Sequence, residues 1–355
     1  MNNIKKHWWK VLTVLILLYV FLVGLLAPLA PGIEVVTPQS VKTGSVFEMQ
    51  ITGYNTHFTK AKEPIRAWLK IDSAHAICAE VIRIIDDTHL EAGFTVPNII
   101  PGDDKVIVYT TLILNSDVDG SSIMPSAASV TIDSTADKNE ATWSSCLVSQ
   151  LYANDQYNFP YRNILSETIR NLYFHVPMWF GMMFILLASV IASIRYLSSK
   201  NPIYDIKGKA YAQVGVVYGL LGLLTGGIWA QYTWGSFWSF DIKQNMSAIA
   251  VLIYLAYFVL RSSFDDFDKQ ARIGAVYNIF AFTMLVPLLF IIPRMYSSLH
   301  PGNGGNPGFG GEDLDNTMRT VFYPAVIAWT LFGFWIANLS IRVFKIRAKM
   351  MDEMS

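Results

Sequence analysis

The chain has 355 residues, of which 52% are hydrophobic and only 15% charged, and its formal net charge is zero. A soluble domain rarely leaves so few charges for its surface, so the composition indicates a membrane protein. The zero net charge and the lack of a lysine-rich tail give no reason to expect a nucleic-acid partner.

Uncharged stretches long enough to cross a bilayer recur along the chain. A helical span needs about 20 apolar residues. The stretches that approach this length predict six transmembrane helices, at 11–30, 176–194, 210–240, 244–260, 273–293 and 320–341. The third stretch is too long for one span, so we expect its last part to lie at the interface or to form an external loop.

Lysines and arginines beside the spans predict the orientation, because cytoplasmic loops carry the excess of positive charge. The short loops on one side hold only Lys243, Arg294 and Arg319. The loops on the other side, together with both termini, hold Lys5, Lys6, Lys10, Arg195, Lys200, Lys207, Lys209, Arg261, Lys269, Arg272, Arg342, Lys345, Arg347 and Lys349. We therefore expect a multi-pass membrane protein with both termini in the cytoplasm.

The first span, 8–30, has two interpretations. A basic start, an apolar run and "APLAPG" also resemble a secretory signal with a cleavage site. The run is longer than a usual signal core, and Pro28 and Pro31 crowd the site, which favours an uncleaved transmembrane helix. In both cases the next segment lies outside the membrane on the periplasmic side.

Residues 33–160 are polar enough to form a soluble domain. Apolar and polar residues alternate in "VFEMQITGY" (46–54), "IRAWLKID" (65–72) and "KVIVYTTLIL" (105–114), with turn residues between such runs. This pattern predicts a small β-sandwich inserted between the first two spans. The order of turn and strand patterns at the start of this segment resembles that of an immunoglobulin-like TIG domain. The expected fold class is thus mainly α, with six transmembrane helices and an inserted periplasmic β-sandwich-like domain.

Cys78 and Cys146 are the only cysteines, and both fall in this insert. On the oxidising side of a membrane such a pair favours a structural disulfide, and a redox pair acting on client thiols is the alternative. His57, His75 and His89 show no metal-ligand spacing, so we expect them to be ordinary surface or turn residues.

Unusual residues gather at the external ends of the central spans. His175 opens the second span, a tryptophan-rich segment follows the third, and His300 follows the fifth. Taken singly, the histidines read as interface anchors and the tryptophans as an aromatic belt. The glycine-rich stretch 302–311 neither follows a strand nor opens a helix, which argues against a phosphate-binding loop. The segment contributes Trp229, Trp234, Gly235, Phe237, Trp238, Phe240, Asp241 and Lys243.

In combination these residues indicate a site for a flat ligand. Two neutral imidazoles on one face can supply both axial ligands of a haem iron, and indoles offer a broad apolar surface beside a macrocycle. Cations at the water-exposed edge of the site would bind the two haem propionates, and Asp241 would orient a cation or an indole N–H. The cations available there are Lys243, Arg294 and Arg319.

The motif "WGSFWSFD" (234–241) resembles the tryptophan-rich signature of the cytochrome c assembly family, W-G-x-x-W-x-W-D followed by a basic residue. With "HVP" opening one span, "LH" after another, and six spans, the chain is similar to the CcmC-type haem-handling branch of that family. The resemblance covers 8–30 and 162–347, a membrane core whose tryptophan-rich loop is 229–245. The insert 33–160 departs from the family, whose first two spans a short loop usually joins.

The resemblance implies roles residue by residue. His175 and His300 match the family's two external haem ligands, and Trp229, Trp234, Gly235, Trp238 and Asp241 match signature positions. Three departures stand out. Phe240 replaces a tryptophan and loses an indole donor, Lys243 replaces arginine and its bidentate geometry, and Asn245 replaces a hydroxyl residue.

The family's function is non-enzymatic haem handling. The resemblance implies that haem b is bound as cargo at the outer face of the bacterial inner membrane and passed to a periplasmic haem chaperone, with an ATP-binding-cassette release complex as a further partner. A haem lyase, a b-type cytochrome subunit and a solute transporter are the alternatives. Lyases and b-type cytochromes usually carry histidines within their spans, whereas here we expect none inside a span. A transporter coupled to ions would need an acidic residue in a span, and the predicted spans contain none, which argues against this alternative.

Overall fold

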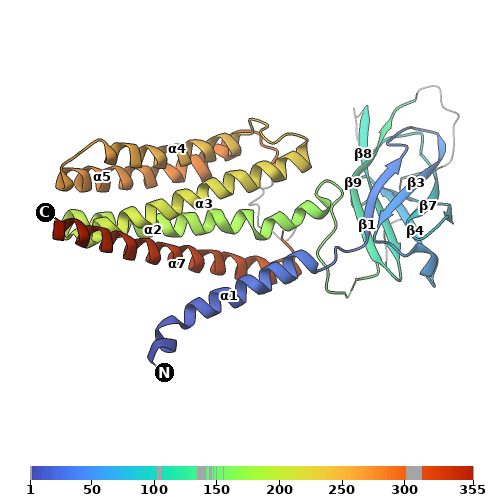
Figure 1. Ribbon diagram of the computed structural model, residues 1–355. Coiled ribbons are helices and arrows are strands. Elements are labelled where there is room, and N and C mark those ends of the chain that lie inside the picture. Colours follow the sequence, from blue (N-terminus) through green and yellow to red (C-terminus); the bar gives the residue numbers. More distant parts are fainter. Residues whose placement is uncertain are drawn as a thin grey trace. The chain divides into compact units, whose positions relative to one another are not determined.

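The computed structural model describes residues 2–101, 106–133, 141–143, 146, 148, 150–154, 156–300 and 314–354. The chain divides into two compact units, one formed by Met1–Ala27 with Thr168–Ser355 and the other by Pro28–Glu167 (Figure 1). The first unit is helical and the second is built mainly of strands.

The helical unit contains the long apolar helices α1 (Asn2–Leu26), α2 (His175–Ser199), α3 (Pro202–Trp234), α4 (Ile242–Ser262), α5 (Phe267–Val286) and α7 (Asn316–Met354), and the short helix α6 (Ile292–Met295). A 3-10 segment, η2 (Ser166–Tyr173), precedes α2, and a π-helical turn, η3 (Pro287–Ile291), joins α5 to α6. Among the described residues, six helical segments are long and apolar enough to cross a bilayer. They fit the polytopic, mainly helical membrane protein that the composition predicts.

The limits of α3 follow local signals. Asn201 accepts a hydrogen bond from the backbone N–H of Ile203, and Pro202 occupies the first helical position. The helix therefore begins before residue 210, where the uncharged stretch begins. Gly235 adopts a φ of 78°, the left-handed conformation that ends the helix after Trp234. The rest of the overlong stretch forms a loop, as its length predicts.

Glycines on α3 allow α2 to approach closely. A Cβ atom at Gly222 would lie 2.7 Å from the indole ring of Trp179, and one at Gly226 would lie 2.7 Å from Cε1 of His175. Small residues permit such close packing of helices in membranes. Helix α7 packs against α2 and α3, while α4 and α5 pack against each other (Figure 1).

The second unit contains two sheets. One has the order β1-β3-β7-β6 and is antiparallel, and the other has the order β2-β9-β8-β4-β5, with β2 parallel to β9. The strands are β1 (Gly32–Thr37), β2 (Ser40–Lys42), β3 (Val46–Tyr54), β4 (Arg66–Lys70), β5 (Ala76–Cys78), β6 (Val81–Ile84), β7 (His89–Thr95), β8 (Ile107–Ser116) and β9 (Gly120–Thr131). Buried residues alternate along β7, and one core unites side chains of both sheets.

The cysteines and histidines of this unit have local partners. Cys78, at the end of β5, forms a disulfide with Cys146. Each of the three histidines uses Nδ1 toward a carboxylate, at 3.1, 2.8 and 3.0 Å for His57 with Asp119, His75 with Asp72 and His89 with Asp86. The described residues contain no group of three or more histidine, cysteine or acidic side chains placed to hold a metal ion.

Candidate functional site

His175 is the first residue of α2 and lies against α3. Its Nδ1 is 3.1 Å from Oγ1 of Thr225, and the missing side chain of Gly226 makes room for the imidazole. The Thr225 hydroxyl donates its proton to the carbonyl of Leu221 at 2.8 Å, so toward His175 it acts as an acceptor. The tautomer that fits this bond carries the proton of His175 on Nδ1.

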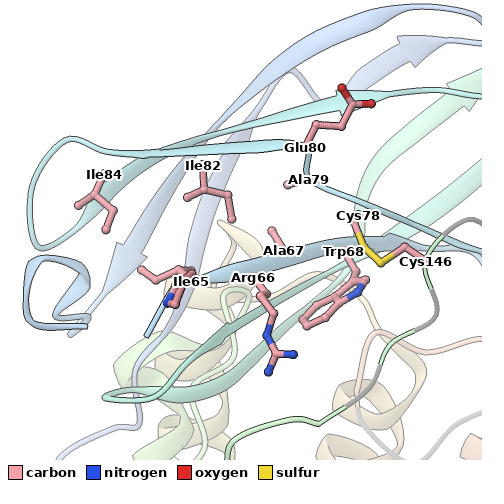
Figure 2. A pocket seen from close by; sticks show the side chains of 11 residues that line it. Ile65, Arg66, Ala67, Trp68, Cys78, Ala79, Glu80, Ile82, Ile84 and Cys146 are labelled. Carbon is pink, nitrogen blue, oxygen red and sulfur yellow. A yellow bond between two sulfur atoms is a disulfide. The ribbon is translucent and has the colours of Figure 1, made fainter. Parts of the chain in front are cut away.

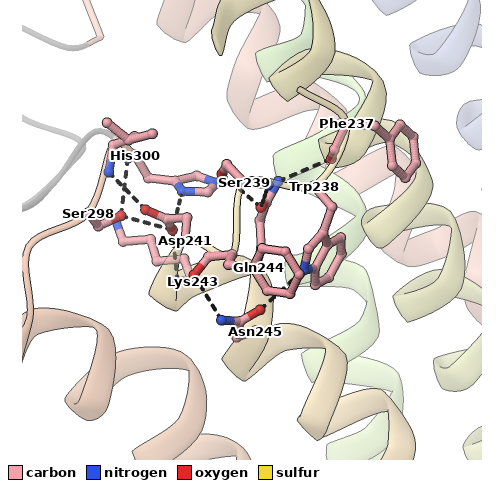
Figure 3. A network of polar contacts seen from close by, with 11 residues as sticks. Phe237, Trp238, Ser239, Asp241, Lys243, Gln244, Asn245, Ser298 and His300 are labelled. Atoms are coloured by element: carbon pink, nitrogen blue, oxygen red, sulfur yellow. Dashed lines mark hydrogen bonds and ion pairs between the residues drawn. The ribbon is translucent and has the colours of Figure 1, made fainter. Parts of the chain in front are cut away.

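His300 follows α6 and is held by Asp241. Its Nδ1 lies 2.9 Å from Oδ1 of Asp241, and the same carboxylate accepts from the backbone N–H of Leu299 at 2.8 Å and from Oγ of Ser298 at 3.1 Å (Figure 3). Because an ionised carboxylate only accepts, the proton of neutral His300 also sits on Nδ1. The two histidines thus have the same tautomer.

Asp241 joins two parts of the chain. It caps α4 by accepting from the backbone N–H of Lys243 at 2.8 Å, and it is only 8% exposed. Burial by itself would raise the pKa of Asp241, but the hydrogen bonds from His300, Leu299 and Ser298 hold that pKa well below its usual range. The side chain of Asp241 holds His300. That Asp241 also orients a cation or an indole N–H stays a prediction.

Two of the expected aromatic residues contact His300. The ring centroids of Trp229 and Trp234 lie 5.9 and 4.7 Å from that of His300, and the two indoles are 4.9 Å apart. Both belong to the last turns of α3, and His300 comes from a distant part of the chain. His300 is therefore contacted by two indoles whose ring planes are inclined to each other by 74°.

The other residues of the motif are held by the start of α4. Trp238 donates its indole N–H to Oδ1 of Asn245 at 3.2 Å, and Asn245 donates to the carbonyl of Phe240 at 2.8 Å (Figure 3). The ring of Phe237 packs over Gly227, and Phe240 is 78% exposed. Asn245, which stands where the family has a hydroxyl residue, thus fixes the loop through its amide group.

The two histidines lie against neighbouring turns of α3. His175 contacts Thr225 and Gly226, and His300 contacts Trp229, one turn further along the same helix. Residues three or four apart share a helix face, so both imidazoles reach the same end of α3. Each ring bonds a side-chain partner through Nδ1, and the backbone of Gly222 is a further hydrogen-bond partner of His175. In the tautomer with the proton on Nδ1, the lone pair of each ring is on Nε2.

The three expected cations lie on different elements. Lys243 is in the first turn of α4, and Arg294 is exposed on α6. Arg319, in the first turn of α7, donates from Nη1 to Oδ1 of Asn316 at 3.2 Å. Residues 302–311, the glycine-rich stretch, lie outside the described residues.

Sequence reasoning missed the partners of both histidines. Thr225, Gly226 and Ser298 carry no motif of their own, and "TGG" at 225–227 is the one local signal of a close approach. It also missed a buried ion pair at the other end of α3. Asp205 receives two hydrogen bonds from Arg261, at 2.6 and 2.8 Å.

The second unit contains a separate cavity of about 450 Å³ beside the disulfide (Figure 2). It is lined by Ile65, Arg66, Trp68 and Ile82 among others, and the guanidinium of Arg66 lies 5.5 Å from the Trp68 ring. The lining contains no histidine, so this cavity offers no imidazole ligand for a metal.

The fold and the site define a polytopic membrane protein in which two histidines lie against the last turns of α3, at the start of a tryptophan-rich loop. The family model described as CcmC, heme exporter protein C, matches residues 145–354, which is more than half of the chain. The chain therefore belongs to the CcmC family, as the tryptophan-rich motif indicates. The matched segment includes α2 to α7 and leaves out most of the second unit.

Individual relatives agree with the family. Heme exporter protein C of Bradyrhizobium diazoefficiens is 30% identical over 166 residues, which are 47% of this chain and 62% of that protein. The Paracoccus denitrificans protein of the same name is 26% identical over 184 residues, 52% of this chain and 74% of the relative. That of Escherichia coli K12 is 22% identical over 182 residues, 51% and 70% respectively.

Proposed function

We propose that this chain binds haem between His175 and His300 and hands it to a periplasmic haem chaperone during cytochrome c maturation. The name of the relatives, heme exporter protein C, agrees with haem as the cargo. The observation that carries the proposal is that both imidazoles bond a side-chain partner through Nδ1. Each directs Nδ1 to the protein and keeps Nε2 available, which is the atom that binds haem iron in bis-histidine sites.

The surroundings of the histidines suit a flat, amphipathic ligand. Trp229 and Trp234 present rigid apolar area beside His300, and aromatic rings favour contact with the face or edge of another ring system. We assign the rest of the platform to Gly235, Phe237, Trp238, Phe240 and Asp241, and the propionate contacts to Lys243, Arg294 and Arg319. Lys243 would act as a point charge because an ammonium lacks the planar fork of arginine.

We infer that the site faces the periplasm and that both termini are cytoplasmic. Support comes from the basic residues, which gather on alternate loops, including Lys200 between α2 and α3. The segment Pro28–Glu167 follows α1 and precedes α2, so it would lie on the same side as His175. The disulfide between Cys78 and Cys146 suits that oxidising compartment.

On this proposal the chain carries haem b and forms no covalent bond to it. Binding needs two imidazoles and an apolar surface, and release needs a partner with a higher affinity for the haem iron. The chaperone supplies that partner, and an ATP-binding-cassette complex serves in release after transfer. The chain itself is a transfer protein and not an enzyme.

The absorption spectrum of the purified full-length protein tests haem binding. We expect a Soret band, and we expect His175→Ala or His300→Ala to weaken or shift it. His75→Ala is the matched control, because His75 also bonds a carboxylate through Nδ1 but lies in the other unit. An unchanged spectrum in both site variants would rule out these axial ligands.

A second experiment tests the aromatic surface. Trp234→Ala should lower the transfer of haem to the purified chaperone, because Trp234 lies 4.7 Å from His300. Trp238→Ala should lower it by loosening the loop through Asn245. Trp8→Ala, on an exposed part of α1, is the control. If both loop variants load the chaperone at the wild-type rate, the tryptophans are interface anchors and nothing more.

A further inference from the structure

We propose that the two histidines are unequal ligands: Asp241 makes His300 the tighter one, and the bond from His175 breaks first when haem is handed on. This inference rests on the proposed haem-binding function and adds an order of events to it. It arises from the different partners of the two Nδ1 atoms, which the helices and loops around them fix before any ligand arrives.

His300 is bonded to a charged acceptor. The carboxylate of Asp241 lies 2.9 Å from Nδ1, and the side chains of the pair are only 19% and 2% exposed. Hydrogen bonds to an ionised group are roughly twice as strong as neutral ones, and the shielding from water strengthens this one further. Such a carboxylate makes the other ring nitrogen a better donor to a metal, and its loss typically costs 10–100-fold in affinity.

The carboxylate is itself held firmly. It accepts hydrogen bonds from Ser298 and Leu299, the two residues that precede His300. It also caps α4 by accepting from the backbone N–H of Lys243. Asp241 and His300 are 59 positions apart, so the bond ties two loops together. His300 thus gains both basicity and a fixed orientation from one residue.

His175 is bonded to a neutral acceptor. Oγ1 of Thr225 lies 3.1 Å from Nδ1, and that hydroxyl already donates to the carbonyl of Leu221. Thr225 and the backbone of Gly222, the hydrogen-bond partners of His175 among the described residues, carry no formal charge that would increase the basicity of the ring. The threonine sets the tautomer and the direction of His175 but adds little to its strength as a ligand, so the two sides of the site differ.

The order of release follows from this difference. The coordinate bond between the iron and Nε2 of His175 breaks with its electron pair staying on the nitrogen, and the iron keeps its oxidation state. The vacated position accepts an electron pair from a side chain of the incoming chaperone. The bond to Nε2 of His300 breaks only afterwards, so haem stays attached throughout.

The test measures how fast haem leaves single-histidine proteins. Full-length His175→Gly and His300→Gly variants are loaded with haem in the presence of imidazole, which replaces the missing ring. Imidazole is then removed, and the loss of haem to excess apomyoglobin is followed at the Soret band. We expect the protein that keeps His300 to lose haem at least about tenfold more slowly than the protein that keeps His175.

Asp241→Asn separates ligand strength from general damage. Asparagine caps helices as well as aspartate does, so α4 keeps its start. We expect the substitution to speed haem loss about tenfold in the His175→Gly protein and by a clearly smaller factor in the His300→Gly protein. The matched change, Thr225→Val, should affect only the protein that keeps His175, and by less.

The outcomes distinguish the inference from the proposed function. A wild-type protein that binds no haem overturns both. A wild-type protein that binds haem while the two glycine variants lose it equally fast, or fail equally to bind it, overturns the inequality alone. Equal effects of Asp241→Asn in both backgrounds also overturn it, because they would mean loss of fold. The ferric–ferrous midpoint potential gives an independent readout, and Asp241→Asn should raise it in the protein that keeps His300.

Discussion

Gly226→Ala tests whether the close approach of α2 and α3 sets the position of His175. The new Cβ would lie 2.7 Å from Cε1 and 3.3 Å from Nδ1 of the imidazole, whereas ordinary contact begins near 3.4 Å. The ring must therefore move by about 0.7 Å, which takes Nδ1 out of good hydrogen-bonding geometry with Thr225.

The energies predict a local effect and not unfolding. Overpacking costs about 1–3 kcal/mol, and the better helix propensity of alanine returns about 1 kcal/mol. Net destabilisation is then about 0–2 kcal/mol, which a large helical unit tolerates. Loss of the residue that orients a metal ligand costs more, about 10-fold in affinity or above.

Gly219→Ala is the control, since its Cβ would lie 2.8 Å from Cγ2 of Val251 and touches neither histidine. Both variants are purified as full-length protein, and haem content is measured by Soret absorbance per protein along with the thermal unfolding of the haem-free form. We expect similar unfolding temperatures and a haem content reduced only in Gly226→Ala. A normal haem content in Gly226→Ala, or an equal loss in the control, would refute the reasoning.

Two further predictions concern stability. Asp205→Asn should destabilise the helical unit by about 3–5 kcal/mol, because it removes the charged partner Asp205 from the buried guanidinium of Arg261. A double change of both residues to leucine should recover part of this loss in thermal unfolding. Equal stability of the single variant and the wild type would contradict the prediction. Replacing Cys78 and Cys146 by serine opens a loop that spans 68 positions and should cost the second unit about 4 kcal/mol. Calorimetry of the full chain checks this, and the Soret band should not change because the disulfide and the histidines lie in different units.

Much of the architecture was predictable from local sequence. Apolar length predicted the six membrane helices, and alternation at 46–54 matches β3 residue for residue. The start of α3 was less well predicted, because its first turns carry Asp205, Lys207 and Lys209, which a search for uncharged stretches excludes. Asp205 is buried there through its pairing with Arg261, and that pairing is a contact between two helices.

The sequence by itself determined the helices, the strand-rich segment and the family, because hydrophobic length, periodicity and the motif "WGSFWSFD" are properties of short stretches. It also indicated His175 and His300, through their place at the ends of apolar runs. Only the tertiary structure decided what those histidines bond to. Their partners lie 50 and 59 positions away, at distances set by helix packing. That packing made Asp241 a partner of His300.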